Sequence, residues 1–183
     1  PDAQRPSYAY LKGDLTEAYS QKVRQVRRSF VFLNLGGEVR AVLVVFDRVV
    51  SSDPAFKKYW LLHSMEEPVI AGNNATVALT ERGWTGKLVN TALLPEAGNA
   101  GIVKIGGPGK EFWVFGRNFP NQITRGDPKD SELGAWRVEI SPAKPSAEDL
   151  LLNVLQVMNR AVERPLAAER IDSGGLVGVR IAD

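Results

Sequence analysis

Cysteine is absent from this chain of 183 residues, histidine occurs once, as His63, and the net charge is only +2. Without cysteine the chain can form no disulfide, no thiolate metal site and no cysteine nucleophile. A single histidine argues against a zinc or iron site built wholly within the chain. We therefore expect no cofactor and no metal site. Because the net charge is small, any attraction to polyanions must come from local clusters of basic residues.

Long hydrophobic runs are also missing. No window approaches the roughly 18 consecutive apolar residues that indicate a membrane-spanning helix, so we expect no membrane partner. The sequence begins PDAQRPS, without methionine and without a signal-peptide pattern. This start predicts a fragment of a longer protein, a processed product or a trimmed form.

What the sequence does contain is a dense series of short β-type segments. β-Branched and aromatic runs alternate with Gly, Asn and Pro turns, and the candidate strands cover residues 29–35, 40–50, 59–65, 75–80, 86–94, 102–105, 112–115, 135–140, 150–158 and 176–181. This spacing predicts an all-β fold, an antiparallel β-sandwich of two layered sheets with little helix. We expect one domain over residues 1–183, with core strands in 7–160 and a C-terminal extension, 161–183, that holds a last strand.

Two segments are also compatible with helix. Ser146–Arg160 begins with Ser-x-x-Asp, a helix start signal, but its run LLLNVLQV suits a strand as well. The β character of its surroundings favours strand. Asp14–Tyr19 could form a single helical turn capped by Asp14.

His63 lies inside the second of two strand-like runs, Val42–Val50 and Tyr59–Met65, which a Ser-Ser-Asp-Pro turn separates. One interpretation is a general base or a metal ligand. The other is a histidine that is hydrogen-bonded within a sheet, near a cleft. The second is favoured because no further histidine exists to complete a metal set. His63 therefore stays a candidate for substrate binding only.

The segment KVRQVRRSF contains a cluster of basic residues. Lys22, Arg24 and Arg28 would share one face of an extended strand unless a bulge intervenes. Guanidinium groups match carboxylate and sulfate groups bidentately, so the cluster indicates binding of acidic groups. The alternative is a solvated edge strand that uses charge to block aggregation. No recognised nucleic-acid-binding motif accompanies the cluster, and we expect no nucleic-acid partner.

Three further patterns carry weaker signals. Trp84, in an Arg-Gly-Trp-Thr-Gly turn, is the tryptophan that we expect to be most exposed, and it could stack on a sugar ring. The glycine-rich run IGGPGKEF lacks the spacing of a phosphate-binding loop and predicts a hairpin turn. Asp127–Glu132 is rich in carboxylates but lacks the regular ligand spacing of a calcium loop.

Several segments, taken in order, resemble the heparinase II/III-like family of polysaccharide lyases. They are GDLTEAY, VFDRVVSSDPAFKKYWLLH with EEP, GKLVNTALLP, VKIGGPG, GAWRVEISP and EDLLLNVLQV, and they extend over residues 8–158. The resemblance implies the C-terminal β-sandwich portion of a lyase that cleaves acidic, uronate-containing glycans by β-elimination. It also implies an acidic polysaccharide and an N-terminal helical domain as partners, and a periplasmic or secreted location in a bacterium.

In that family the catalytic and zinc-binding residues lie mainly on the helical domain and at the beginning of the sandwich. The resemblance therefore assigns no catalytic and no metal residue here, and it implies that the chain alone is inactive and supports the substrate cleft. The substrate-binding candidates are Lys22, Arg24, Arg28, His63 and Trp84. Two alternatives remain, a module that binds anionic carbohydrate without cleaving it and a structural module that self-associates through an apolar face.

Overall fold

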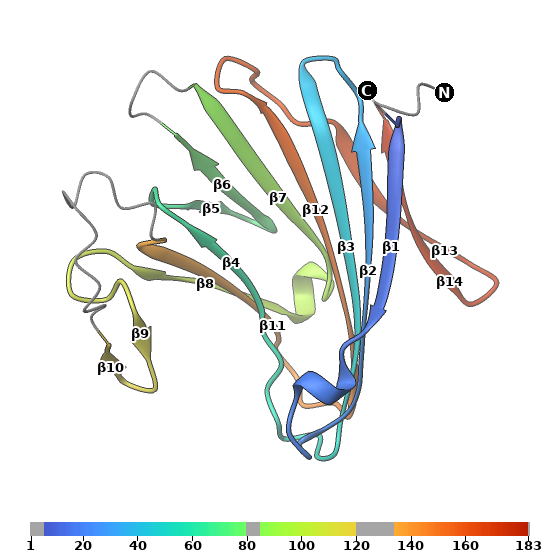
Figure 1. Cartoon of the computed structure of the whole chain (residues 1–183), viewed down its shortest axis with the longest axis vertical. Helices are drawn as coiled ribbons and strands as arrows, with labels where there is room; N and C mark the ends of the chain where they lie inside the picture. Colours follow the sequence, from blue (N-terminus) through green and yellow to red (C-terminus); the bar gives the residue numbers. More distant parts are fainter. Residues whose placement is uncertain (1–5, 80–84, 120–133, 183) are drawn as a thin grey trace.

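The computed structural model describes residues 6–79, 85–119 and 134–182. Within these ranges the helical segments are two short 3-10 turns, η1 (Thr16–Ala18) and η2 (Ala97–Asn99). The strands are β1 (Tyr8–Asp14), β2 (Val23–Asn34), β3 (Val39–Ser51), β4 (Trp60–Ser64), β5 (Val69–Ala71), β6 (Asn74–Ala78), β7 (Gly86–Leu94), β8 (Ala100–Gly106), β9 (Trp113–Val114), β10 (Arg117–Asn118), β11 (Trp136–Pro142), β12 (Glu148–Asn159), β13 (Ala167–Ser173) and β14 (Leu176–Ala182). They form layered antiparallel sheets, so the predicted all-β sandwich is confirmed (Figure 1).

The largest layer is a seven-stranded sheet in the order β1-β2-β3-β12-β7-β6-β5, and every pair of neighbours is antiparallel. β12 lies in its middle, between β3 and β7, although it is distant from both in sequence (Figure 1). The predicted strand in Ser146–Arg160 is therefore confirmed. Six consecutive residues of β12, Leu151–Gln156, are buried. A strand that is covered on both faces loses the alternation of apolar and polar residues, which explains the helix-like run in the sequence.

One face of this sheet, which we name the front face, packs against a three-stranded sheet in the order β4-β11-β8. Trp60, Val138 and Ile140 of the small sheet contact Val45 and Leu151 of the large one. All five side chains are at most 5% exposed, so they form a closed hydrophobic core between the two layers. The burial of such residues is the main favourable contribution to folding.

The opposite face packs against the β13–β14 hairpin and forms a second core. Val42 and Val154 of the large sheet contact Ala168, Val179 and Ile181 at this layer boundary. Gln156 is buried there, and its amide both donates to and accepts from the backbone of Leu166, at 2.9 Å each. The expected C-terminal extension with one strand is therefore a two-stranded hairpin that covers the sheet, and β13 is the strand that the sequence pattern did not reveal.

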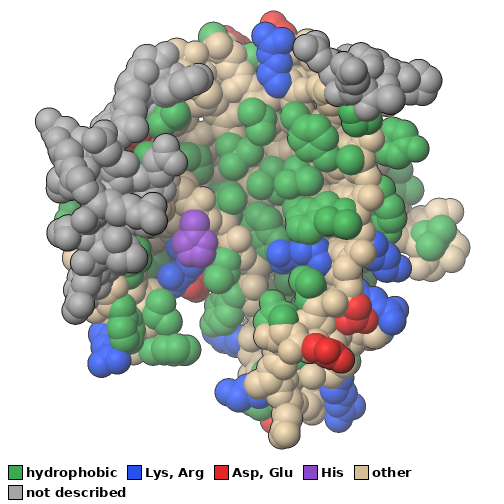
Figure 2. All heavy atoms as spheres, in the orientation of Figure 1, with side chains coloured by type: hydrophobic (Ala, Val, Ile, Leu, Met, Phe, Trp, Pro, Cys, Tyr) green, Lys and Arg blue, Asp and Glu red, His purple; other side chains and the backbone are tan. Residues whose placement is uncertain are grey.

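The front face is only partly covered. Beyond the edge of the small sheet, a group of apolar side chains that belongs to β1, β2 and β3 remains open to solvent, as the hydrophobic surface in Figure 2 shows. We name this group the apolar patch; it consists of Leu11, Phe30, Phe32 and Leu43. Leu11 is 65% exposed and Phe32 is 42% exposed. A contiguous exposed patch of this kind is typical of a surface that contacts another protein part.

Two local predictions need correction. The glycine-rich turn was expected to join strands 102–105 and 112–115 as a hairpin, but β8 pairs with β11 and β9 pairs with β10. The close approach of β8 to β11 requires glycine at position 106, because a Cβ there would clash with the carbonyl oxygen of Ala135 at 2.3 Å. The residues Tyr8–Asp14 form a strand that was not predicted. The expected turn after them appears as η1, but its N-cap residue is Leu15 and not Asp14. Asp14 Oδ1 accepts a hydrogen bond of 3.1 Å from the Thr16 amide.

Candidate functional site

The basic cluster of β2 is divided by a bulge. The register of β2 on β3 shifts between Val23 and Gln25, so Arg24 lies at the irregularity, outside the regular alternation that places Arg28. Lys22 and Arg28 line a common cleft, whereas Arg24 is exposed and does not line it. The shared face was predicted on the condition that no bulge intervenes, and this condition is not met at Arg24, because one extra residue in a strand interrupts the side-chain alternation.

Arg28 forms a bidentate ion pair with Asp47, the residue opposite it on β3. Its Nε and Nη2 donate to the two carboxylate oxygens at 2.6 Å each. These hydrogen bonds raise the pKa of Arg28, and they outweigh burial, which lowers it. The charges of Asp47 and Tyr19 raise this pKa further. Since a charge-assisted bidentate pair fixes both side chains, Arg28 forms a rigid floor for the cleft.

The cleft has a volume of about 400 Å³, and we name it the basic cleft. Residues around η1 and the start of β2 form one wall, and residues from β3 and the turn before β4 form the other. Apart from Lys22 and Arg28, the lining residues were not predicted as site residues; among them are Tyr19, Lys57, Lys58 and Tyr59. For Lys57, Lys58 and Tyr59 the only sequence signal is the run KKYW after a Ser-Ser-Asp-Pro turn, which is too common to identify a site. Chain folding brings it to the β2 cluster, more than 25 residues away.

A second ion pair lies at the same end of the sandwich. Lys58 Nζ is 2.8 Å from Asp149 Oδ2, and the two side chains are 7% and 12% exposed. Lys58 Nζ also donates to the backbone oxygen of Ser146 at 2.5 Å. A buried ammonium group needs such partners, because burial without them would favour the neutral form. The pair connects the turn before β4 to the start of β12.

His63 lies on β4 with its side chain on the outer surface of the small sheet, opposite Arg137 of β11. It is exposed, and no hydrogen bond joins its ring to another described residue, so the expected sheet hydrogen bond is not found. Partial burial and the nearby charge of Arg137 both lower its pKa. Figure 2 shows the histidine on the same side of the molecule as the apolar patch.

His63 borders a groove of about 650 Å³ whose other lining residues come mainly from the β9–β10 hairpin. Arg137 anchors this hairpin, because its Nη2 donates to the Trp113 oxygen at 3.0 Å. The guanidinium also binds Glu139 at 2.7 Å. The tip residue Phe115 is 97% exposed. The structure therefore separates His63 from Lys22 and Arg28, which line a different hollow.

Two of the sequence-based predictions fall on residues outside the described ranges. Trp84 and the carboxylate-rich stretch Asp127–Glu132 lie outside the described residues.

Within the described ranges, no group of three or more His, Cys, Asp or Glu side chains is close enough to hold a metal ion. Among the same residues, no helix has the length and apolar character needed to cross a membrane.

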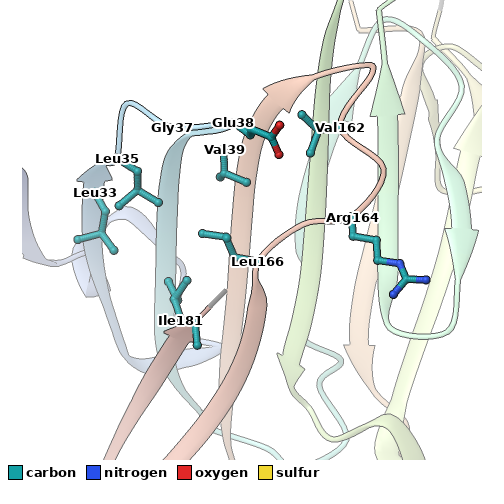
Figure 3. Close-up of a pocket in the computed structure, with 10 residues that line it drawn as sticks. Leu33, Leu35, Gly37, Glu38, Val39, Val162, Arg164, Leu166 and Ile181 are labelled. Atoms are coloured by element: carbon teal, nitrogen blue, oxygen red, sulfur yellow. The ribbon is translucent and has the colours of Figure 1, made fainter.

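A further cavity, of about 800 Å³, lies on the opposite side of the large sheet, next to the β13–β14 hairpin. Leu33, Leu35, Val39, Leu166 and Ile181 form an apolar group in this cavity, and the Arg164 guanidinium points away from them (Figure 3). An apolar lining of this kind does not suit an anionic ligand. The basic cleft is therefore the better candidate for the function that the cationic residues indicate.

The basic cleft can bind and neutralise an anion, and its described lining also holds two tyrosines, Tyr19 and Tyr59. It contains no histidine, and its carboxylate, Asp47, is paired with Arg28. A general base must be free to accept a proton near neutral pH. Neither a histidine nor this paired carboxylate is therefore available as a base in the cleft.

Comparisons with known proteins show similarity at the level of the fold. No protein family matches the sequence, and no curated protein matches it either. Among solved structures, the heparan sulfate lyase HepC from Pedobacter heparinus superimposes with a TM-score of 0.57 at 12% identity, over 96% of this chain and 24% of that one. A mutant of the same lyase gives a TM-score of 0.47 at 11% identity, over 89% and 25% of the two chains. The chain thus has the fold of a β region that makes up about a quarter of that lyase.

Proposed function

We propose that this chain is the β-sandwich portion of a polysaccharide lyase that cleaves acidic, uronate-containing glycans by β-elimination. In this role it supports the substrate cleft and does not supply the full catalytic set. The observation that carries the proposal is the superposition of 96% of the chain on part of a heparan sulfate lyase. The basic cleft adds chemical support, because an acidic glycan needs cationic groups along its path.

β-Elimination requires three groups in one place. A base removes the proton beside the uronate carboxylate, a cationic or hydrogen-bonding group neutralises that carboxylate, and an acid protonates the leaving oxygen. His63 is the only histidine of the chain, and it lies apart from the lysines and arginine of the basic cleft. In this proposal another part of the protein contributes residues to the complete set.

The apolar patch supports a helical domain of the same protein as that other part. The chain corresponds to 24% of the lyase on which it superimposes, so most of that lyase has no counterpart here. Leu11 and Phe32, exposed at 65% and 42%, would be covered by such a domain. The patch and the side of the molecule that carries His63 face the same direction (Figure 2). In this proposal the substrate lies between the two parts, and the protein acts in the periplasm or outside a bacterial cell.

The test is to express the complete gene that encodes this chain and to incubate its product with several uronate-containing glycans. The reaction creates a double bond conjugated to the carboxylate, which is read as ultraviolet absorbance. We expect this absorbance from the complete gene product and none from the chain alone. Absence of the unsaturated product with every acidic glycan would contradict the proposal.

A second candidate is a module that binds anionic carbohydrate without cleaving it. The basic cleft favours it, because this cleft is built entirely from residues of the chain. It predicts that the complete gene product binds acidic glycans and releases no unsaturated sugar. A purely structural module predicts a third result, self-association of the isolated chain through the apolar patch without affinity for glycans.

A further inference from the structure

We infer that the basic cleft is a subsite for one anionic group of a sugar residue, a carboxylate or a sulfate ester, bound by the ammonium groups of Lys22 and Lys57. This inference rests on the proposed function, since it names the part of an acidic glycan that the chain contacts. Lys22 lies just before β2, and Lys57 lies in the turn between β3 and β4. Both residues line the cleft.

The dimensions of the cleft suit a sugar. Its volume of about 400 Å³ falls within the range of small-molecule sites, roughly 300–1,000 Å³. Three aromatic side chains, Tyr19, Phe56 and Tyr59, contribute to its walls. Aromatic rings offer apolar contact to the ring carbons of a sugar, and tyrosine hydroxyls can bond to its hydroxyl groups.

The charges of the lining leave two lysines for a ligand. The lining holds four cationic residues, Lys22, Arg28, Lys57 and Lys58, and one carboxylate, Asp47. Arg28 is occupied by Asp47, and Lys58 is occupied by Asp149 next to the cleft. No described carboxylate forms an ion pair with Lys22 or Lys57. A pocket with two unneutralised ammonium groups attracts anions, and its concave shape strengthens the local potential.

The site is held in place before a ligand binds. The Ser52 amide donates to the Lys22 oxygen at 2.9 Å, which ties the two walls together. The Lys22 ammonium lies 5.4 Å from the centre of the Phe56 ring, in the range of a cation–π contact. Ser51 Oγ donates to the Asp53 oxygen at 2.8 Å and so fixes the start of the turn that carries Lys57. The Lys22 side chain and the backbone of the two walls therefore lose less freedom on binding.

The type of cation decides how selective the subsite is. A guanidinium fork recognises planar carboxylates in a fixed geometry, but the fork of Arg28 is already bound to Asp47. Lys22 and Lys57 act as point charges without a preferred angle. We therefore expect the subsite to accept a uronate carboxylate or a sulfate ester and to reject a neutral sugar.

The experiment measures the affinity of the purified chain for three oligosaccharides of equal length by isothermal titration calorimetry at low salt. The probes are an unsulfated galacturonate oligomer, a sulfated galactan oligomer without carboxylates and a neutral cello-oligosaccharide. We expect binding of the first two and none of the third. Binding of only one anionic probe supports the subsite and identifies its anion. Binding of neither, or equal binding of the neutral probe, overturns the inference.

Lys22→Gln and Lys57→Gln are the test variants, and Lys12→Gln is the matched control. All three lysines are exposed, and Lys12 lies on β1 outside the cleft, so none of these changes should disturb folding. Arg28 is left in place, because its loss would leave the buried Asp47 carboxylate unpaired. We expect each test variant to weaken binding of the anionic probe about threefold to tenfold, with no change for Lys12→Gln. Equal affinities for all variants would overturn the inference.

The same variants separate this inference from the proposed function. If the complete gene product forms unsaturated uronate and neither Lys22→Gln nor Lys57→Gln changes its KM, the lyase proposal stands and the subsite is rejected. If the variants lose affinity and the complete gene product forms no unsaturated sugar, the subsite stands and the lyase proposal is rejected.

Discussion

Arg28 and Asp47 form a bidentate ion pair in which the two members differ strongly in their access to water. The hydrogen bonds from Arg28 Nε and Nη2 are both 2.6 Å long. The side chain of Asp47 is 2% exposed, whereas that of Arg28 is 34% exposed. Removing Arg28 should therefore cost more stability than removing Asp47, because only Arg28 can turn to solvent when its partner is lost.

We predict that Arg28→Gln lowers the free energy of unfolding by about 3 kcal/mol, because it leaves a buried carboxylate without its cation. Asp47→Asn should cost only about 1 kcal/mol, since the amide keeps one acceptor and Arg28 can reach water. Urea denaturation measures both values. Equal losses would show that the asymmetry in burial does not control the energetics of the pair.

The Lys58–Asp149 pair gives a second prediction about buried charge. Lys58→Met should cost about 3 kcal/mol, because Asp149 is only 12% exposed and would lose its cation. Arg180→Met is the control, since the Arg180–Glu169 pair is exposed at 65% and 58% and should contribute less than about 0.5 kcal/mol. The double variant Lys58→Met with Asp149→Leu should regain much of the loss. Thermal or urea unfolding that places the two single variants at the same stability would contradict this account.

Asn90 and Asn153 form a buried polar pair between β7 and β12, and both are fully buried. Asn90 Nδ2 donates to Asn153 Oδ1 at 3.1 Å, while Asn90 Oδ1 and Asn153 Nδ2 have no partner among the described residues. We predict that Asn153→Leu alone costs about 2 kcal/mol, because it leaves the other amide unbonded in the core. Combining it with Asn90→Leu should bring stability back toward that of the unmodified chain. A double-mutant cycle in urea tests this, and additive losses would argue against it.

His63 should titrate below the ordinary histidine pKa of about 6.5, because partial burial and the charge of Arg137 both oppose its protonation. As the only histidine, it can be followed without overlap by proton NMR. Arg137→Gln should raise the pKa partway, since burial is the larger cause, whereas Arg137→Lys keeps the charge and should leave it low.

The same shift makes stability depend on pH. The unfolded chain binds a proton at His63 more readily than the folded chain does. Above the unfolded pKa this difference has no effect on stability. As the pH falls from the unfolded pKa to the folded pKa, it lowers the free energy of unfolding progressively. His63→Gln should remove this component of the acid destabilisation. A variant whose stability follows pH as the unmodified chain does would show that His63 does not contribute.

Much of the fold could be predicted from local pattern. The runs of β-branched and aromatic residues located β3, β4, β6, β7, β8, β9, β11, β12 and β14 within about two residues at each end, and they indicated the layered antiparallel class. For β2 they located only the second half, because the strand begins at Val23 and the prediction at Ser29. β12 was ambiguous because it is buried on both faces. β13 was missed because its sequence, AAERIDS, contains only one strongly apolar residue, Ile171. Such a segment becomes a strand through its pairing with β14 and its packing on the large sheet.

The sequence by itself determined that the chain is a β-sandwich, that His63 lies in a strand and that basic residues gather near the start of β2. Only the tertiary structure decided which of these residues meet. Arg24 lies at a bulge and does not line the cleft that contains Arg28, and the turn before β4 brings Lys57 to the same cleft as Lys22. His63 was directed to the outer surface of the small sheet. The physical reason is that strand propensity follows from neighbours along the chain, whereas the face of a side chain and its partners depend on register and on layers assembled from distant segments.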